Sequence, residues 1–146
     1  MIFMELIKGH IKKAIATKAK RWSAMITLII TLIIVTPFCG FLFQCGCDWP
    51  WSGLDARCNY YYKTNAVQQC PWCASMITGI FSTVLAIIAS IWTATASLPL
   101  TYQQPVNEVT IRTIFSLMVF LLVAILTAGF AALWQDYSLG IGSYLR

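Results

Sequence analysis

Apolar residues dominate this sequence in three long runs that contain no Asp, Glu, Lys, Arg or His. The runs cover residues 22–43, 74–98 and 113–134. A helix needs about 20 residues to cross the hydrocarbon core of a bilayer, and each run is long enough. The pattern therefore predicts an all-α integral membrane protein with three transmembrane helices over these ranges.

The residues before the first run alternate apolar and charged positions with a helical period. The apolar side carries Phe3, Leu6, Ile7, Ile11, Ala14 and Ile15, and the other side carries Glu5, Lys8, Lys12 and Lys13. Basic amphipathic helices of this kind lie in the interface of an anionic leaflet. We therefore expect residues 1–21 to form an interfacial helix that binds anionic lipid or a partner subunit. The interleaved apolar face argues against nucleic-acid binding.

Composition agrees with membrane placement. Of 146 residues, 59% are hydrophobic and only 10% are charged, whereas soluble domains carry about 25% charged residues. A water-soluble fold of this size buries too small a fraction of its surface to hide so many apolar side chains. The composition therefore excludes an ordinary soluble domain.

The basic residues are distributed unevenly about the first run. Six of the ten Lys and Arg residues precede it: Lys8, Lys12, Lys13, Lys18, Lys20 and Arg21. Cytoplasmic flanks accumulate Lys and Arg, so we expect a cytoplasmic N-terminus and a cytoplasmic segment 99–112. Residues 44–73 and 135–146 are then extracytoplasmic. A bacterial inner membrane fits this arrangement.

The second predicted span is rich in small residues at four-residue intervals. Small residues let helix backbones approach closely, so this face should pack against the chain's other helices or against another subunit. The candidate partner-binding positions here are Gly79, Ser82, Ala86 and Ser90. The three spans contain no ionisable side chain, and the single histidine is His10. Autonomous ion transport and a histidine-based site are therefore not expected.

All six cysteines lie in one segment that ends at the second predicted span. They are Cys39, Cys45, Cys47, Cys58, Cys70 and Cys73. An even number of cysteines in an oxidising compartment is typical of a disulfide framework. One interpretation is therefore a structural staple that clamps the outer ends of the first two spans, with its pairing left open.

A second interpretation is redox chemistry at Cys70-Pro71-Trp72-Cys73. A cysteine at the N-terminus of a helix has a lowered pKa, and Cys45 and Cys47 could form a relay pair. This scheme is similar to that of the DsbB and vitamin-K-epoxide-reductase families, in which membrane cysteine pairs exchange electrons with quinone, although those families have more spans. The resemblance implies a membrane thiol–disulfide oxidoreductase with Cys70 and Cys73 as its catalytic pair.

A third interpretation is a metal site. Paired cysteine thiolates bind zinc or copper, and the candidate ligands are Cys45, Cys47, Cys70 and Cys73. No other cofactor is expected.

Aromatic residues accompany the cysteines, notably Trp49, Trp51 and Trp72. Such residues form belts at membrane surfaces, and they also dominate protein–protein interfaces. Taken together, the sequence predicts a small non-catalytic accessory or assembly subunit of a larger membrane complex, with a disulfide-stapled aromatic cap. The oxidoreductase and metal-binding hypotheses stay open beside it.

Overall fold

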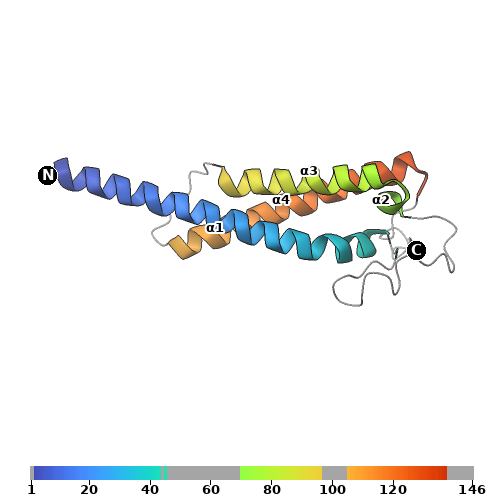
Figure 1. Ribbon diagram of the computed structural model, residues 1–146, viewed down its shortest axis with the longest axis horizontal. Coiled ribbons are helices and arrows are strands. Elements are labelled where there is room, and N and C mark those ends of the chain that lie inside the picture. Colours follow the sequence, from blue (N-terminus) through green and yellow to red (C-terminus); the bar gives the residue numbers. More distant parts are fainter. Residues whose placement is uncertain (1, 44, 46–69, 97–104, 138–146) are drawn as a thin grey trace.

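The computed structural model describes residues 2–43, 45, 70–96 and 105–137, and the regular secondary structure in these residues is helical (Figure 1). The helices are α1 (Ile2–Phe43), α2 (Pro71–Ala74), α3 (Met76–Thr95) and α4 (Pro105–Trp134). Three segments are long and apolar enough to cross a membrane: Lys18–Phe43, Ile77–Thr95 and Asn107–Trp134. The prediction of an all-helical chain with three candidate membrane spans is confirmed.

The helix boundaries differ from the expected ones at the N-terminal side of two spans. Helix α1 is continuous from Ile2, and its first half extends past the other helices (Figure 1). The contact of residues 1–21 with a membrane surface stays a prediction. Helix α4 begins at Pro105 rather than at Thr113, because proline is well suited to the first position of a helix.

The helix is interrupted at Ser75, at the start of the expected second span. Its backbone is extended (φ −128°, ψ 104°), so it ends α2 and serves as the N-cap of α3. The Ser75 hydroxyl accepts a hydrogen bond from the Thr78 N–H at 3.4 Å, which satisfies one of the unpaired donors of the first turn. The chain therefore changes direction here, and the Cys70–Cys73 motif forms a separate helical turn.

The three long helices pack side by side, each against the other two (Figure 1). Buried residues recur at intervals of four positions, or eight between Thr31 and Cys39, along the inner face of each helix. They are Ser23, Thr27, Thr31 and Cys39 on α1, Ser82, Ala86, Ser90 and Ala94 on α3, and Ser116, Phe120, Ala124 and Ala128 on α4. Most of these side chains are small, which lets the backbones approach closely.

Large apolar side chains cover the outside of the bundle, whereas hydroxyl groups lie inside it. Ile77, Trp92 and Leu133 are 81%, 76% and 82% exposed. Several inner hydroxyls are hydrogen-bonded: that of Ser90 donates to the Ile87 carbonyl at 2.8 Å, and those of Ser23 and Thr113 lie 3.2 Å apart across two helices. The buried Thr27 hydroxyl has no partner among the described residues. This distribution is the reverse of a water-soluble fold, and it suits a hydrocarbon environment, where apolar surface has no reason to be buried.

The small residues of α3 pack against the other helices of this chain. Ser82, Ala86 and Ser90 are buried in the bundle, so their side chains are not open to another subunit. Of the two possibilities that the sequence left open for this face, the structure shows packing against the chain's own helices.

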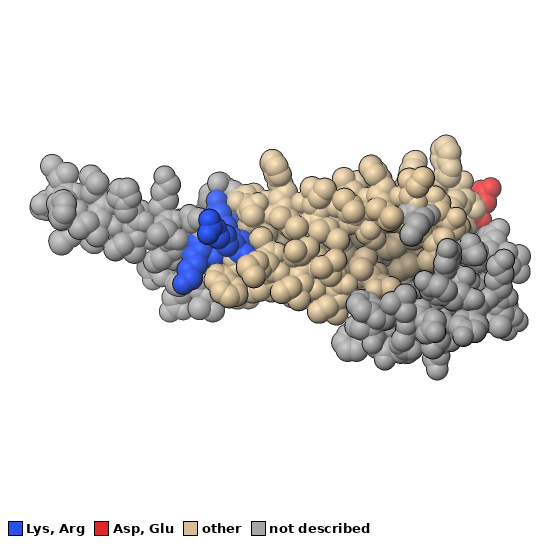
Figure 2. Space-filling view, viewed as in Figure 1, with Lys and Arg blue, Asp and Glu red and all other residues tan. Residues whose placement is uncertain are grey.

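Among the described residues, acidic atoms show at one end of the bundle, and Lys and Arg gather at the opposite end (Figure 2). Arg112 lies there but is buried, with its side chain only 3% exposed. Its Nε donates to the Glu108 carboxylate at 2.8 Å, and its Nη1 donates to the carbonyls of Ala96 at 2.7 Å and Ala94 at 3.4 Å. Because the last carbonyls of a helix have no partner within it, Arg112 closes the C-terminal end of α3 and joins it to α4.

We predict that Arg112→Ala destabilises the bundle by about 1–3 kcal/mol, because the Glu108 carboxylate and the carbonyls of Ala94 and Ala96 lose their charged donor. Arg112→Lys should recover part of this loss, since an ammonium group cannot reproduce the fork of a guanidinium. Thermal unfolding in detergent, followed by circular dichroism, measures both effects. Arg21→Ala is the control, because Arg21 is exposed. Equal melting temperatures for the two alanine variants would contradict the capping role.

Candidate functional site: a cluster of four cysteines

The end of α1 supplies the first two cysteines of the site. Cys39 lies on the inner face of α1, and Cys45 follows the end of that helix; both are buried. Their Sγ atoms are 3.7 Å apart, and the Cys45 thiol also donates to the Cys39 carbonyl at 3.7 Å. Cys45 therefore lies against the last turns of α1.

The turn of α2 supplies the other two. Cys70 is the N-cap residue of α2, and the N–H groups of Cys73 and Ala74 donate to its carbonyl at 2.9 and 2.8 Å. The Cys70 Sγ lies 3.9 Å from the Cys39 Sγ. The sulfurs of Cys39, Cys70 and Cys73 all lie within 4.8 Å of one another. Cys39, Cys45, Cys70 and Cys73 are called the cysteine cluster below.

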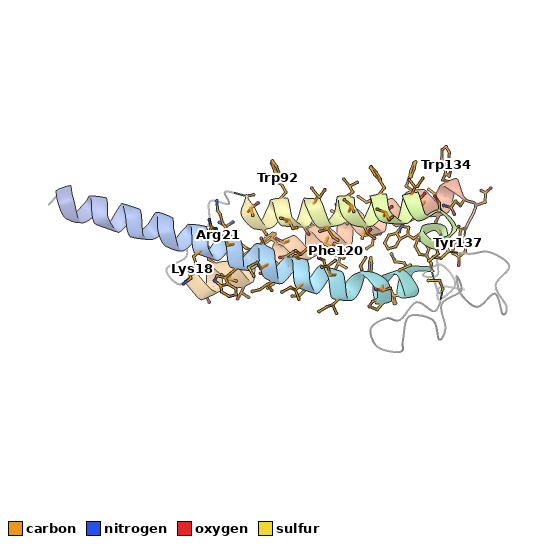
Figure 3. The ribbon with its side chains drawn as sticks, in the orientation of Figure 1. Lys18, Arg21, Trp92, Phe120, Trp134 and Tyr137 are labelled. Atoms are coloured by element: carbon orange, nitrogen blue, oxygen red, sulfur yellow. The ribbon has the colours of Figure 1, made fainter. Side chains whose placement is uncertain are left out.

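Two residues that follow α4 hydrogen-bond to the segments that carry the cysteines, one to the end of α1 and one to α2. The Tyr137 hydroxyl donates to the Phe43 carbonyl at 2.9 Å, and the Gln135 amide donates to the Pro71 carbonyl at 3.1 Å. The Phe43 ring lies edge-on to the rings of Trp72 and Tyr137, with centroids 5.5 and 5.9 Å away. Tyr137 lies at the same end of the bundle as Trp134 and opposite Arg21 (Figure 3).

The position of Tyr137 follows from how α4 ends. Asp136 has a left-handed backbone (φ 50°). The Tyr137 N–H then donates to the Ala132 carbonyl at 2.8 Å, and the Asp136 N–H donates to the Leu133 carbonyl at 3.4 Å. This pair of bonds is a Schellman motif, and it turns the chain so that Tyr137 faces the end of α1.

Helix α2 packs against α3 at Gly79. A Cβ atom built on Gly79 would lie 2.5 Å from the Trp72 carbonyl oxygen, a distance at which one of the two helices has to move. The absence of a side chain at Gly79 therefore brings α2, with Cys70 and Cys73, close to the bundle.

A cavity of about 260 Å³ borders the cluster between α1 and α3. Its walls are mostly apolar and are formed by Val35, Thr36, Cys39, Trp72, Cys73, Gly79, Ile80 and Thr83. Cys73 is half-buried, whereas Cys39, Cys45 and Cys70 are buried. Cys73 is therefore the thiol of the cluster that a small molecule reaches first.

The surroundings shift the pKa of two groups at the site. Hydrogen bonds from Cys39 and then Cys45 lower the pKa of Cys70, while Cys73 and burial act in the opposite direction. The one-turn helix α2 is too short to contribute a large dipole, so the neighbouring thiols take the place of the expected helix effect. Burial, followed by the nearby cysteines, raises the pKa of Tyr137, which keeps its hydroxyl protonated as a donor.

The structure brings together four of the six cysteines singled out in the sequence. They are recorded as thiols, and the Sγ separations are contacts rather than bonds of about 2.05 Å, so a disulfide framework stays a prediction. Cys47, Cys58, Trp49 and Trp51 lie outside the described residues. The Trp72 side chain is buried, so it is not open for docking to a partner.

Sequence reasoning left Cys39 out of the redox and metal sets, and it missed Gln135 and Tyr137. The four-residue repeat of Ser23, Thr27 and Thr31 continues to position 39 and places Cys39 on the inner face of α1. No such local signal exists for Gln135 and Tyr137.

Comparison of the chain with protein families, with curated proteins and with solved structures finds no match.

We predict that Gly79→Ala destabilises the protein by about 1–3 kcal/mol through overpacking against Trp72 and raises the alkylation rate of the buried Cys70. Gly129→Ala is the matched control, since nothing lies within 4 Å of a Cβ there. It should be neutral or stabilising by up to about 1 kcal/mol, as alanine is the better helix former. Unfolding and mass-spectrometric alkylation measure the two effects. Unchanged Cys70 reactivity in Gly79→Ala would show that this contact does not position α2.

Proposed function

We propose that this protein is a membrane thiol–disulfide oxidoreductase in which the pairs Cys39–Cys45 and Cys70–Cys73 exchange electrons. The observation that carries the proposal is the distance of 3.9 Å between the Sγ atoms of Cys39 and Cys70, one from each pair. Thiol–disulfide exchange requires direct contact between the attacking and the attacked sulfur. The proposal places the cluster on the extracytoplasmic side of the membrane, as the distribution of Lys and Arg predicts.

The exchange conserves electrons within the chain. The Cys39 thiolate attacks the Cys70 sulfur of a Cys70–Cys73 disulfide, and Cys73 leaves as a thiolate that takes up a proton. The Cys45 thiol, after losing its proton, then attacks Cys39 in the mixed disulfide and releases Cys70 as a thiolate, which is protonated in turn. One disulfide is broken and one is formed, and two protons move from one pair to the other.

Turnover requires an external electron donor and an external acceptor. A dithiol substrate would supply two electrons and two protons to one pair and leave as a disulfide. A neutral, lipid-soluble two-electron acceptor would reach Cys73 through the apolar cavity between α1 and α3 and leave with the two electrons and two protons. The apolar walls favour an uncharged molecule, because burying an unpaired charge there is costly.

One prediction concerns the pKa of Cys70. Because hydrogen bonds lower the pKa of Cys70, its thiolate forms at lower pH than that of an ordinary cysteine. Cys39→Ala removes the largest lowering contribution and should shift the titration to higher pH. The measurement is the ultraviolet thiolate absorbance against pH, taken as a difference from the same protein carrying Cys70→Ser. A titration of Cys70 that is unchanged by Cys39→Ala would contradict this account.

The relay itself is tested with the double variant Cys45→Ser and Cys73→Ser, which removes the resolving thiol of each pair. After mild oxidation in detergent, we expect a stable Cys39–Cys70 disulfide, identified by peptide mass spectrometry, in most molecules. The matched control, Cys47→Ser with Cys58→Ser, should retain exchange in the whole cluster. Failure to find the Cys39–Cys70 bond in a folded double variant would refute electron transfer between the pairs.

A further inference from the structure

Three sulfurs of the cysteine cluster form one compact group, and the fourth, that of Cys45, contacts this group through Cys39. Cys39 is the common neighbour: its Sγ lies 3.7 Å from that of Cys45 and 3.9 Å from that of Cys70. The Sγ atoms of Cys39, Cys70 and Cys73 all lie within 4.8 Å of one another. Two independent disulfide pairs do not require this mutual proximity.

These separations match the coordination shell of a tetrahedral thiolate metal site. Zinc binds cysteine sulfur at about 2.3 Å, so two sulfurs of a zinc tetrahedron are about 3.8 Å apart. The Cys39–Cys45 and Cys39–Cys70 separations already have this length. Cys45 completes the tetrahedron by moving closer to the other two sulfurs, and Cys73 has to approach Cys39 and Cys70 by no more than about 1 Å. Because Cys73 is half-buried at the edge of a cavity, its side chain has room for that movement.

We propose that the reduced cluster binds one Zn²⁺ ion through Cys39, Cys45, Cys70 and Cys73. Four sulfur donors favour Zn²⁺ among the common divalent ions, because oxygen-preferring Mg²⁺ and Ca²⁺ bind thiolates poorly. This proposal goes beyond sulfur exchange and does not depend on it. Metal binding needs only the thiols and their geometry.

The surroundings of the site make its affinity depend strongly on pH. Four thiolates around Zn²⁺ leave a net charge of −2, and Lys and Arg among the described residues gather at the opposite end of the bundle (Figure 2). None of the described Lys and Arg residues therefore lies near enough to help the thiols lose their protons to the metal. Binding should release protons and tighten as the pH rises.

The ligand set differs from the one that the sequence suggested. The sequence suggested Cys45, Cys47, Cys70 and Cys73, whereas this proposal uses Cys39 in place of Cys47, which lies outside the described residues. The metal would then tie the end of α1 directly to α2. Because a sulfur in a disulfide is not a thiolate ligand, zinc binding and the oxidised states of the cluster exclude each other.

The test is a metal titration of the full chain, purified in detergent, reduced and stripped of metal with a chelator. Co²⁺ serves as a coloured probe of tetrahedral thiolate coordination, and Zn²⁺ is then added to displace it. We expect one equivalent of Zn²⁺ per chain. Cys39→Ser and Cys73→Ser should each weaken binding by at least about 100-fold, because losing a ligand costs no less than losing its supporting contacts.

Matched variants distinguish this zinc site from a site that uses other cysteines and from disulfide exchange alone. Cys47→Ser with Cys58→Ser should bind Zn²⁺ like the wild-type chain. Cys73→His keeps a zinc ligand but cannot form a disulfide, so it should retain Zn²⁺ within about tenfold while the exchange reaction is lost. The proposal is overturned if the reduced, folded chain binds no Zn²⁺, or if Cys47→Ser weakens binding as much as Cys39→Ser does.

Discussion

Close packing of three helices through small side chains is the constraint on which the rest of this structure depends. Ala86 of α3 and Ala124 and Ala128 of α4 are almost completely buried at the centre of the bundle. Larger side chains there would separate the helices, because association in a bilayer relies on packing rather than on hydrophobic burial. The same close approach, continued at Gly79, brings α2 against the bundle and its cysteines against Cys39 of α1.

The sequence predicts the three spans well because the signal is physical and strong: long runs without an ionisable residue have no other stable solution. It does not predict the break at Ser75, since serine is tolerated within membrane helices and its capping role depends on the direction that the chain takes next. Nor does it predict the contacts of Gln135 with Pro71 and of Tyr137 with Phe43. These join residues that are 64 and 94 positions apart, a separation at which local patterns carry no information.

The three functional hypotheses from the sequence depend on different residues, and the structure places some of these residues. An accessory subunit drew support from the small-residue face of α3, but Ser82, Ala86 and Ser90 are buried within this chain. Binding to a larger complex is therefore a proposal that needs another surface. We therefore base both proposals on the cysteines, because one buried contact, between Cys39 and Cys70, underlies both electron exchange and tetrahedral metal coordination. Which state the cluster occupies then depends on its oxidation.

The convergence of Cys39 and Cys70 is the central claim, and cross-linking in native membranes tests it most directly. A chain that keeps only these two cysteines, with the other four replaced by serine, is treated with a mild oxidant and examined by peptide mass spectrometry. Phe41→Cys in place of Cys39 is the comparison, because Phe41 is 59% exposed on α1. The account predicts nearly complete linkage of Cys39 to Cys70 and little linkage from position 41. Equal linkage from both positions, or none from Cys39, would contradict it.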